Sequence, residues 1–519
     1  MRSDNEALPD VIDAGTVPRW DEEADVLVVG YGMAGACAAL EAVNAGADTL
    51  IIERFSGHGG TSAVAGGHFY LGGGTPVQTA CGFEDSAEEM EKFLTAITPS
   101  PIPEKIHDYS FDSVAHFHWL EAQGIAFERS FYPHKTMMQP GTEGLIWSGN
   151  EEVHPYRDMA RPAPRGHKVS FPGMEGGGGF ALQHLDARFR AAGGRVMTDA
   201  RVDALVRDEG GICGVGASAA GGRTVHLRAR RGVVLAGGGF GQNRAMVRHF
   251  LPKFADAGER VEFIGAPGED GSAIRLGQSA GGRTVHMEEL FATSFFYPPE
   301  QLLKGILVNA EGDRFVAEDS YHARSAIGIT RQPEGRAYLI LDSDIFAYPE
   351  HAKWMHQELV DGWETVEEME AGLGISAGAL ARTLALYNAD AERGTDSRFG
   401  KHRKWLKPLN APPYAAFDMS FGRAHFTAFT LGGLETAVDG AVLDSDGSPV
   451  AGLFAAGSCA SGIAQESENY ASGTCLGQAS YFGRRAGFAA ARRGTAETAG
   501  WTAAPQPCQS RGLSAGQPA

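Results

Sequence analysis

A glycine-rich turn between a short apolar run and a helical pattern constrains the fold of this chain more than any other feature. The run Ala24–Gly30 reads ADVLVVG, which predicts a buried parallel strand. Gly30, Gly32 and Gly35 follow with GxGxxG spacing, and AGACAALEAVNAGA after them has helical spacing. A second apolar run, DTLIIER, covers Asp48–Arg54. Together these segments predict a βαβ unit with the length of a dinucleotide-binding fold.

The three glycines have separate physical tasks in a nucleotide site. They allow the tight turn, let the backbone reach a pyrophosphate, and let the helix pack closely on the strand. The N-terminus of the helix then favours the phosphate charge, and Glu53 suits a ribose diol rather than a 2′-phosphate. The alternative is a glycine turn beside a surface glutamate. The expected nucleotide contacts are Gly30, Gly32, Met33, Ala34, Gly35, Glu53 and Arg54.

Three later stretches favour FAD over NAD as the cofactor. RFSGHGGTSAVAGGHFYLGGGTP, after Glu53, is a second glycine-rich loop with hydroxyls that can lie along a flavin and its phosphates. Val233–Phe240 resembles the second nucleotide-contacting strand of two-domain FAD enzymes, and Gly452–Ser458 resembles their C-terminal flavin segment. The further cofactor contacts we expect are Gly60, Thr61, Ser62, Gly66, Gly67, Val202, Ala236, Gly237, Gly457, Thr474, Cys475 and Leu476.

Composition excludes several other classes of protein. The 519-residue chain carries a formal net charge of −19, which argues against non-specific nucleic-acid binding. It has no apolar run of about 18 residues, so we expect no membrane span. The acidic N-terminal segment is not a secretory signal. The six cysteines lack CxxC pairs and zinc spacing, so we expect reduced thiols, no metal and a cytoplasmic location.

The pattern along the chain predicts an α/β protein of two domains. Residues 1–280 and 421–492 are expected to form one Rossmann-like FAD-binding domain. Residues 281–420 are richer in aromatic and charged side chains and contain the apparent strands LKGILVNAEG and AYLILDSD. They predict an inserted α+β capping domain that carries catalytic residues. Residues 493–519 are rich in Ala, Gly, Pro, Gln and Thr, which predicts a disordered tail.

Over nearly its whole length, the chain resembles the fumarate reductase and succinate dehydrogenase flavoprotein superfamily. This resemblance implies a flavin at the interface of the two domains. Covalent members carry a histidine ahead of an AxxGG-type turn, a place that falls on Gly60 here, so the resemblance implies non-covalent FAD. Dicarboxylate-reducing members carry an arginine in an NRLGG-like loop, where this chain has Tyr470 in NYASG. The loss of that cation disfavours fumarate and succinate as substrates.

Within that superfamily, the chain is similar to the Δ4-(5α) branch of the 3-ketosteroid dehydrogenases. The catalytic set of that branch, a tyrosine in the capping domain and a Tyr-x-Ser in the C-terminal loop, matches Tyr321, Tyr470 and Ser472. The Δ1 branch has a Tyr-Pro-Gly loop instead, without the serine. The supporting stretches are GGHFYLGGGTPVQTACGFEDS, GNEEVHPYRDMARPAPRGHKVSFPG and GILVNAEGDRFVAEDSYHAR.

The resemblance implies the following chemistry. Tyr470 and a backbone N–H from Thr474 or Cys475 would hold the C3 carbonyl and stabilise the enolate. Ser472, linked to Tyr321, would accept the C4 proton, and hydride would pass from C5 to flavin N5. The expected substrate is a small apolar ketone, and an electron acceptor of unassigned identity reoxidises the flavin. The alternatives are a Δ1-dehydrogenase, a fumarate reductase-like enoate reductase and a flavin-binding redox sensor.

Ordinary structural roles compete with these assignments. Tyr470 and Tyr321 can be packing aromatics, and Ser472 can be a simple helix N-cap. His322 is expected to point away from Tyr321, because adjacent side chains of an extended segment face opposite ways. Six further side chains either wall a cleft for a flat four-ring substrate or belong to the core: Phe131, Tyr132, Met137, Met138, Phe295 and Phe296.

Overall fold

The predicted βαβ unit lies within the largest sheet of the molecule. In the computed structural model, which describes residues 8–495 and 500–505, β2 (Glu22–Val29) leads into α1 (Met33–Asn44) and then β3 (Thr49–Ile52). The two strands pair in parallel, with Val26 opposite Thr49. All four residues of β3 are buried, as expected for an inner parallel strand whose faces are both covered. The prediction of this unit is confirmed.

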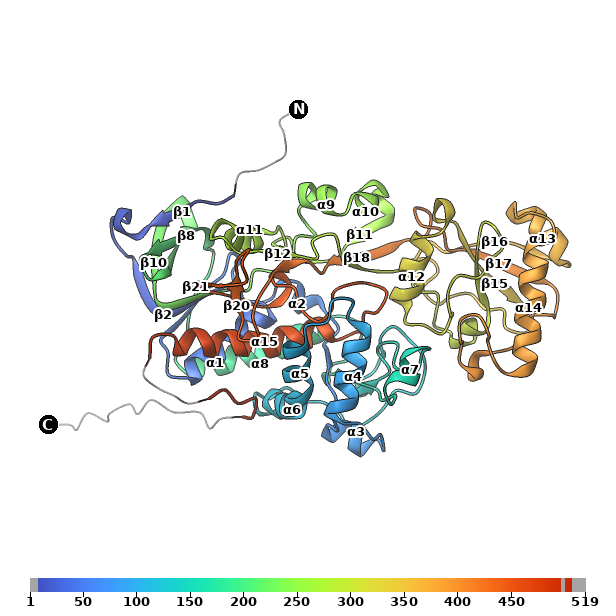
Figure 1. The fold of residues 1–519 in the computed structure, drawn as a ribbon, viewed down its shortest axis with the longest axis horizontal. Helices are drawn as coiled ribbons and strands as arrows, with labels where there is room; N and C mark the ends of the chain where they lie inside the picture. The colour runs from blue at the N-terminus through green and yellow to red at the C-terminus, as the bar shows by residue number, and fades with distance from the viewer. Residues whose placement is uncertain (1–7, 496–499, 506–519) are drawn as a thin grey trace, which may run out of the picture.

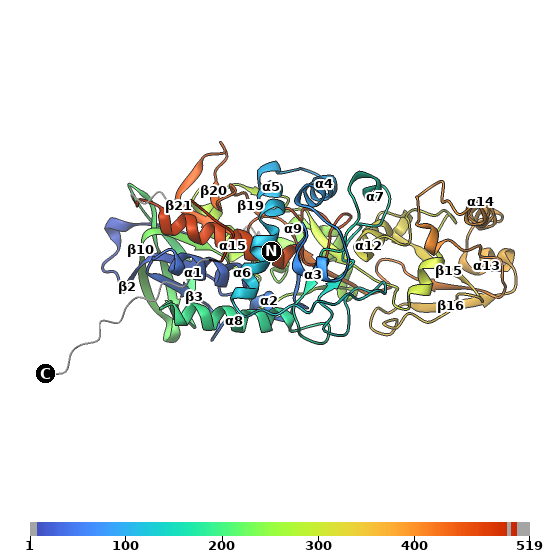
Figure 2. The ribbon, with the colours of Figure 1, turned by 90° about the horizontal axis from the view of Figure 1, so that it is seen from below.

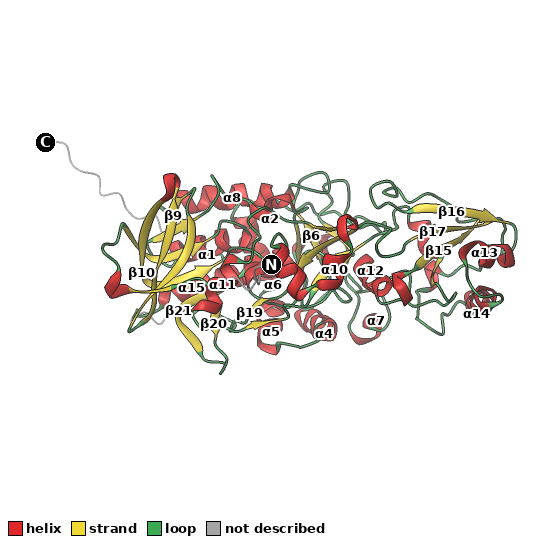
Figure 3. Cartoon of the chain, turned by 90° about the horizontal axis from the view of Figure 1, so that it is seen from above, coloured by secondary structure: helices red, strands yellow, loops and turns green. Residues whose placement is uncertain are grey.

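Among the described residues the sheet has nine strands, of which five form a parallel set in the order β7, β3, β2, β10 and β21. The first half of β10 instead continues an antiparallel meander with β9 and β8. Figure 3 shows this sheet at one end of the molecule. The glycine segments after β2, β10 and β21 therefore meet at one edge. The remaining bounds are β1 (Val11–Asp13), β7 (Arg195–Met197), β8 (Arg201–Asp208), β9 (Gly211–Ala219), β10 (Arg223–Leu235), β20 (Ala441–Leu443) and β21 (Pro449–Ala455).

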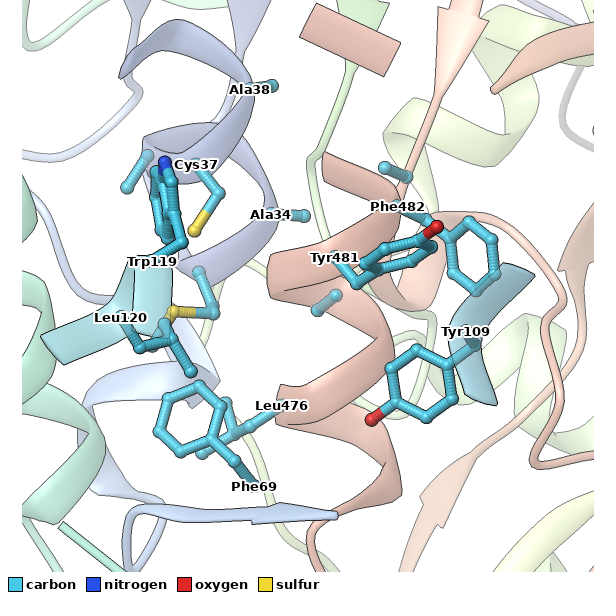
Figure 4. Close-up of a cluster of buried hydrophobic side chains, with 14 of the residues drawn as sticks. Ala34, Cys37, Ala38, Phe69, Tyr109, Trp119, Leu120, Leu476, Tyr481 and Phe482 are labelled. Atoms are coloured by element: carbon cyan, nitrogen blue, oxygen red, sulfur yellow. The ribbon is translucent and has the colours of Figure 1, made fainter. Parts of the chain in front are cut away.

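Two helices from opposite ends of the chain pack against each other beside this sheet. These are α1 and the long C-terminal helix α15 (Thr474–Arg492). A Cβ atom on Gly483 would lie 2.5 Å from the carbonyl oxygen of Ala34, and one on Gly487 would lie 2.0 Å from that of Ala38. Glycine is therefore required for this approach. Figure 4 shows the apolar cluster that surrounds the contact, with Cys37, Trp119, Tyr481 and Phe482 among its members.

The rest of the first domain consists of short helices and small sheets joined by long loops. The region from 127 to 178 holds only short elements before α8 (Gly177–Ala191). The helices are α2 (Gly60–Val64), α3 (Pro76–Ala80), α4 (Ala87–Ile97), α5 (Pro103–Phe111), α6 (Ser113–Ala122), α7 (Tyr156–Met159), α9 (Arg244–Phe250), α10 (Pro252–Asp256) and α11 (Ser272–Ser279). The strands are β4 (His68–Tyr70), β5 (Leu145–Ile146), β6 (Gly166–Lys168), β11 (Val261–Phe263), β12 (Thr284–Val285), β13 (Leu290–Thr293), β18 (Phe426–Thr430) and β19 (Gly433–Leu434).

A second body of structure lies at the opposite end of the molecule from the large sheet (Figures 1 and 2). Its antiparallel sheet has the order β14 (Ile306–Asn309), β15 (Ala337–Asp342), β17 (Tyr414–Asp418) and β16 (Glu358–Trp363). Its helices are α12 (His322–Thr330), α13 (Val366–Leu373) and α14 (Ala379–Arg393). A separate apolar core unites residues from Phe296 to Phe426. The predicted α/β fold with an α+β cap is confirmed. The limits 281–420 remain our prediction, although Leu290 and Ala292 of β13 belong to the apolar core of the large sheet.

The segment after α15 is described only in part. Residues 496–499 and 506–519 of the predicted disordered tail lie outside the described residues. The stretch 500–505 lies against α15, where the Trp501 ring is 5.7 Å from that of Phe488. The Ala503 carbonyl accepts a hydrogen bond of 2.9 Å from Arg484.

Three further properties concern the described residues. Cys37, Cys81, Cys213, Cys459 and Cys475 are free thiols, while Cys508 lies outside the described part. Within the described ranges, no helix has the length and apolar character needed to cross a bilayer. The same ranges contain no group of His, Cys, Asp and Glu arranged to hold a metal ion.

Candidate active site

A cavity of about 410 Å³ opens where the ends of the parallel strands face the second body. Gly30, Glu53 and Ala236 line it from the sheet, and Tyr321 and Trp354 line it from the other side. The cavity therefore brings together most of the residues predicted from the sequence. Those that line it are Gly30, Gly32, Met33, Ala34, Glu53, Arg54, Gly60, Thr61, Ser62, Gly66, Gly67, Val202, Ala236, Gly237, Gly457, Cys475 and Leu476, together with Tyr321, Tyr470 and Ser472.

Two predicted cofactor contacts, Gly35 and Thr474, are not in the lining. A Cβ atom on Gly35 would lie 2.1 Å from the Gly30 carbonyl oxygen, so this glycine lets the helix pack on the turn. The Thr474 N–H and hydroxyl both donate to the Ala471 carbonyl, at 3.2 and 2.7 Å. Thr474 therefore closes the turn before α15, and its N–H is already used.

The nucleotide end of the cavity is organised around the buried carboxylate of Glu53. Its Oε2 accepts the Tyr31 N–H at 2.7 Å, and its Oε1 accepts the Phe55 N–H at 2.9 Å. These bonds fix the carboxylate at the end of β3, where a ribose diol is recognised. Gly30 has a φ of +105°, and a Cβ there would meet the Ala236 carbonyl at 2.5 Å. The turn, the helix N-terminus and the acid together fit a dinucleotide.

The catalytic candidates come from two segments distant in sequence. Tyr321 directly precedes α12, whereas Tyr470 and Ser472 lie in the loop before α15. The two phenol rings have centroids 6.3 Å apart, and Tyr470 also packs 4.6 Å from Phe291. The structure thus brings together the three residues that the resemblance singled out.

Burial sets the protonation of these hydroxyls. It raises the pKa of Tyr321, and a hydrogen bond with Ser472 partly opposes that shift. Burial also raises the pKa of Tyr470 well above the ordinary value, and the thiol and backbone N–H of Cys475 lie within hydrogen-bond reach of its phenol. The pKa of the Cys475 thiol is itself raised to about 11 by burial. At neutral pH all these groups are protonated, so Tyr470 is available as a donor.

Comparison with known proteins places this site in a family. The FAD binding domain family model matches residues 25–474. The chain belongs to this family of FAD-binding flavoproteins. A 3-oxo-5-alpha-steroid 4-dehydrogenase of Comamonas testosteroni is 30% identical over 520 residues, covering 86% of this chain and 95% of the relative. The predicted cofactor, FAD, is confirmed by the family.

Similarity to solved structures narrows the assignment within this family. A crystal structure of 3-ketosteroid-delta4-(5alpha)-dehydrogenase from Rhodococcus jostii RHA1, in complex with 4-androstene-3,17-dione, matches with 41% identity and a TM-score of 0.86. The match covers 94% of this chain and 100% of that one. A 3-ketosteroid delta1-dehydrogenase from Sterolibacterium denitrificans shares the fold at 22% identity, with a TM-score of 0.64 over 91% of this chain and 99% of that one. The predicted resemblance to the Δ4-(5α) branch is confirmed.

The expected orientation of His322 is wrong. His322 and Tyr321 both line the cavity, with ring centroids 3.9 Å apart. The segment is not extended, because α12 begins at His322 and turns the two side chains to one side. The imidazole Nδ1 is 2.6 Å from the Thr293 hydroxyl, and burial lowers the pKa of His322 to about 3. It is therefore a neutral group of the cavity wall.

The apolar wall differs in part from the six candidates. Met137, Met138 and Phe295 line the cavity. Phe131 instead packs 4.8 Å from Phe83, and Phe296 belongs to the core of the second body; Tyr132 is also outside the lining. Further wall residues were not predicted. Tyr31, Met174 and Trp354 lie in turns and loops, and Phe291 and Phe429 lie in two strands, β13 and β18, that are far apart in sequence.

Proposed function

We propose that this chain is an FAD-dependent dehydrogenase that introduces a C4–C5 double bond into 3-ketosteroids. The observation that carries the proposal is the convergence of Tyr470, Ser472 and Tyr321 in the apolar cavity that also contains the nucleotide turn. The similarity to a 3-oxo-5-alpha-steroid 4-dehydrogenase and to a Δ4-(5α)-dehydrogenase bound to 4-androstene-3,17-dione supports the same substrate class.

Tyr470 and Cys475 are the proposed binders of the C3 carbonyl oxygen. The Tyr470 phenol remains protonated because burial raises its pKa. The Cys475 N–H belongs to the first turn of the 19-residue helix α15, whose positive end favours a developing negative charge. Two donors aimed at one oxygen stabilise an enolate more than the ketone from which it forms. The hydrogens on C4 thereby become more acidic.

Ser472 is the proposed acceptor of the C4 proton. Its hydroxyl is hydrogen-bonded to Tyr321, so it can gain one proton at Oγ while it passes another to the phenol oxygen, which releases its own proton in the same step. FAD held at the glycine turn would supply the oxidant that takes the hydride of C5. The substrate loses one proton and one hydride, and the new double bond is conjugated with the C3 ketone. The aromatic and methionine wall excludes water from the reacting carbons.

The same assignment separates this chain from two alternatives. A Δ1-dehydrogenase would form its double bond at C1–C2, and Ser472 favours C4 instead. An enoate reductase for dicarboxylates would need a cation where Tyr470 lies. An external electron acceptor and a cytoplasmic location belong to the proposal as predictions.

Anaerobic flavin bleaching tests the proposal. The purified holoenzyme would be mixed with 5α-androstane-3,17-dione and the steroid product identified by mass and proton spectra. We expect loss of flavin absorbance and formation of androst-4-ene-3,17-dione. A 5α-androstane that carries a ketone only at C17 is the matched control and should leave the flavin oxidised. A C1–C2 product, or reoxidation of the reduced enzyme by fumarate alone, would contradict the assignment.

A further inference from the structure

The loop segment Ser148–Glu151 contacts both segments that carry the catalytic candidates. The Ser148 carbonyl accepts the Ser472 N–H at 2.7 Å. The Asn150 Oδ1 accepts the Tyr321 N–H at 2.8 Å, and its Nδ2 donates to the Glu468 carbonyl at 3.4 Å. The segment therefore fixes Tyr321 and Ser472 relative to each other, although neither lies near it in sequence.

The last residue of this segment is a buried acid that is only half satisfied. Glu151 is 1% exposed, and its Oε2 accepts the Gly149 N–H at 2.9 Å. Its Oε1 is buried and has no hydrogen-bond partner among the described residues. A Cβ atom on Gly149 would lie 3.3 Å from that Oε1 and 2.8 Å from the Ala471 Cβ, so the free oxygen is close to the catalytic loop. The hydrogen bond from Gly149 satisfies one carboxylate oxygen, whereas the other is buried without a partner and calls for a functional reason.

The charges around Glu151 leave it able to bind a proton. The groups that face it are Arg165, Lys135, Tyr70 and Tyr321. The guanidinium of Arg165 is largely engaged, because its Nε and Nη2 donate to Asp85 at 3.0 and 2.7 Å. Burial raises the pKa of Glu151 and outweighs the opposing effects of Arg165 and Lys135. Such a carboxylate is a better proton acceptor near neutral pH than one on the surface.

Other buried polar atoms lie in the surroundings of this carboxylate. Ser148 Oγ, Tyr70 Oη and Arg165 Nη1 are also buried without a partner in the described part of the chain. Buried polar atoms that lack protein partners bind ordered water. A relay that ended at the phenol would need Tyr321 to begin as a phenolate, which burial disfavours because it raises the pKa of Tyr321. The reaction therefore needs a terminal base that neither hydroxyl supplies.

We propose that Glu151 is the proton acceptor at the end of the relay that begins at Ser472 and passes through Tyr321. This inference rests on the proposed function and adds a residue to it. As Ser472 gains the C4 proton, its own proton moves to Tyr321, and the phenol proton moves through water to Glu151. The carboxylate becomes a neutral acid while the hydride goes to the flavin. The acid releases its proton to solvent before the next turnover.

The variant Glu151→Gln tests this role. It keeps the size of the side chain and the acceptor for the Gly149 N–H but removes the base. We expect anaerobic flavin reduction by 5α-androstane-3,17-dione to slow by about 10²-fold. The wild-type rate should fall as pH drops through the raised pKa of Glu151, and this limb should vanish in Glu151→Gln. Glu151→Asp keeps a carboxylate and should keep the limb with a smaller loss of rate.

The neighbouring Glu152→Gln is the matched control. Glu152 is partly exposed and pairs with Lys404 at 2.8 Å, so this variant should retain the wild-type rate and pH profile. A wild-type rate in Glu151→Gln would overturn the proposal. The proposal would also be overturned if Glu151→Gln reduced the rate equally at every pH and kept the low-pH limb. That pattern would indicate a displaced Tyr321 rather than a missing base.

Infrared difference spectra provide a readout that needs no steroid. In the oxidised holoenzyme, the carbonyl band of a neutral buried acid should disappear as pH rises, and Glu151→Gln should lack it. A Glu151 that stays ionised across the whole titration would overturn the proposal. If the wild-type enzyme did not bleach with the steroid, the proposed function would fail, while this titration would still decide whether Glu151 exchanges a proton.

Discussion

At the residue scale, the candidate site depends on hydroxyl groups that burial keeps protonated. Tyr470 is 6% exposed and Tyr321 is 4% exposed. Loss of the proton from either phenol would place a charge in a largely apolar cavity, which is costly. Tyr470 is therefore a hydrogen-bond donor rather than a base. Ser472, which is hydrogen-bonded to Tyr321, can pass a proton onward, so the two tyrosines have different tasks.

Tyr470→Phe should separate catalysis from binding. The change removes one donor at the developing oxyanion, and we expect flavin reduction to slow by about 10²–10³-fold. Steroid binding should weaken much less, because the ring and its contact with Phe291 remain. Stopped-flow reduction and steroid titration of the flavin spectrum measure the two effects. Tyr348→Phe, at a cap tyrosine that is 60% exposed, is the control. A wild-type rate in Tyr470→Phe would remove this tyrosine from the mechanism.

A buried lysine outside the site makes stability depend on pH. Lys105 donates to the Thr436 hydroxyl at 2.8 Å, and burial lowers the pKa of Lys105 from 10.5 to about 8. The unfolded chain therefore binds more protons between those pH values, and the free energy of unfolding rises with pH across that window. Below it, the folded state carries the full cost of the buried charge.

Lys105→Met should stabilise the protein at neutral pH by on the order of 1–2 kcal/mol, since it removes that cost but also the bond to Thr436. The gain should shrink as pH rises through the window. Thermal unfolding of both proteins at several pH values measures it. Lys92→Met, at an exposed lysine paired with Glu89, is the control and should give a small difference at every pH. A gain that did not change with pH would show that packing rather than charge is responsible.

At the scale of elements, regular patterns were predictable and irregular segments were not. The apolar run Ala24–Gly30, the glycine turn and the helical spacing after it follow simple periods, and β2, α1 and β3 lie where expected. Trp354, Asn150 and Glu151 lie in loops without any period, and only the tertiary structure brings them to the site. Phe291 and Phe429 face each other because β13 pairs with β18, a pairing between strands far apart in sequence.

The junction of β2 and α1 gives a test at this scale. Gly35→Ala would place a Cβ atom 2.1 Å from the Gly30 carbonyl oxygen, so the helix must move away from the turn. We expect the purified variant to retain less FAD and to unfold at a lower temperature, because the helix N-terminus no longer meets the pyrophosphate. The ratio of flavin to protein absorbance measures retention. Gly57→Ala adds a Cβ that meets nothing within 4 Å and should retain FAD normally. Equal flavin content in both variants would contradict this account of the turn.

At the scale of the whole molecule, the cavity lies between two bodies with separate cores. We expect the cofactor to bind to the body that contains the large sheet, next to its boundary with the second body. Two histidines line the cavity, His68 and His322. The His68 Nε2 lies 2.7 Å from the Gln139 Oε1, and the His322 Nδ1 is hydrogen-bonded to the Thr293 hydroxyl. A ligand held between the bodies without a covalent bond stabilises the folded state by mass action alone.

Acid precipitation of the holoenzyme should therefore release the flavin into the supernatant and leave a colourless pellet. Removal of FAD under mild conditions should lower the unfolding temperature, and added FAD should restore it in a concentration-dependent way. A thousandfold excess of FAD over its dissociation constant corresponds to about 4 kcal/mol. A yellow pellet would contradict non-covalent binding, and peptide mapping would then distinguish attachment at His68 from attachment at His58, which is outside the cavity lining. His68→Gln would abolish the yellow pellet only in the first case.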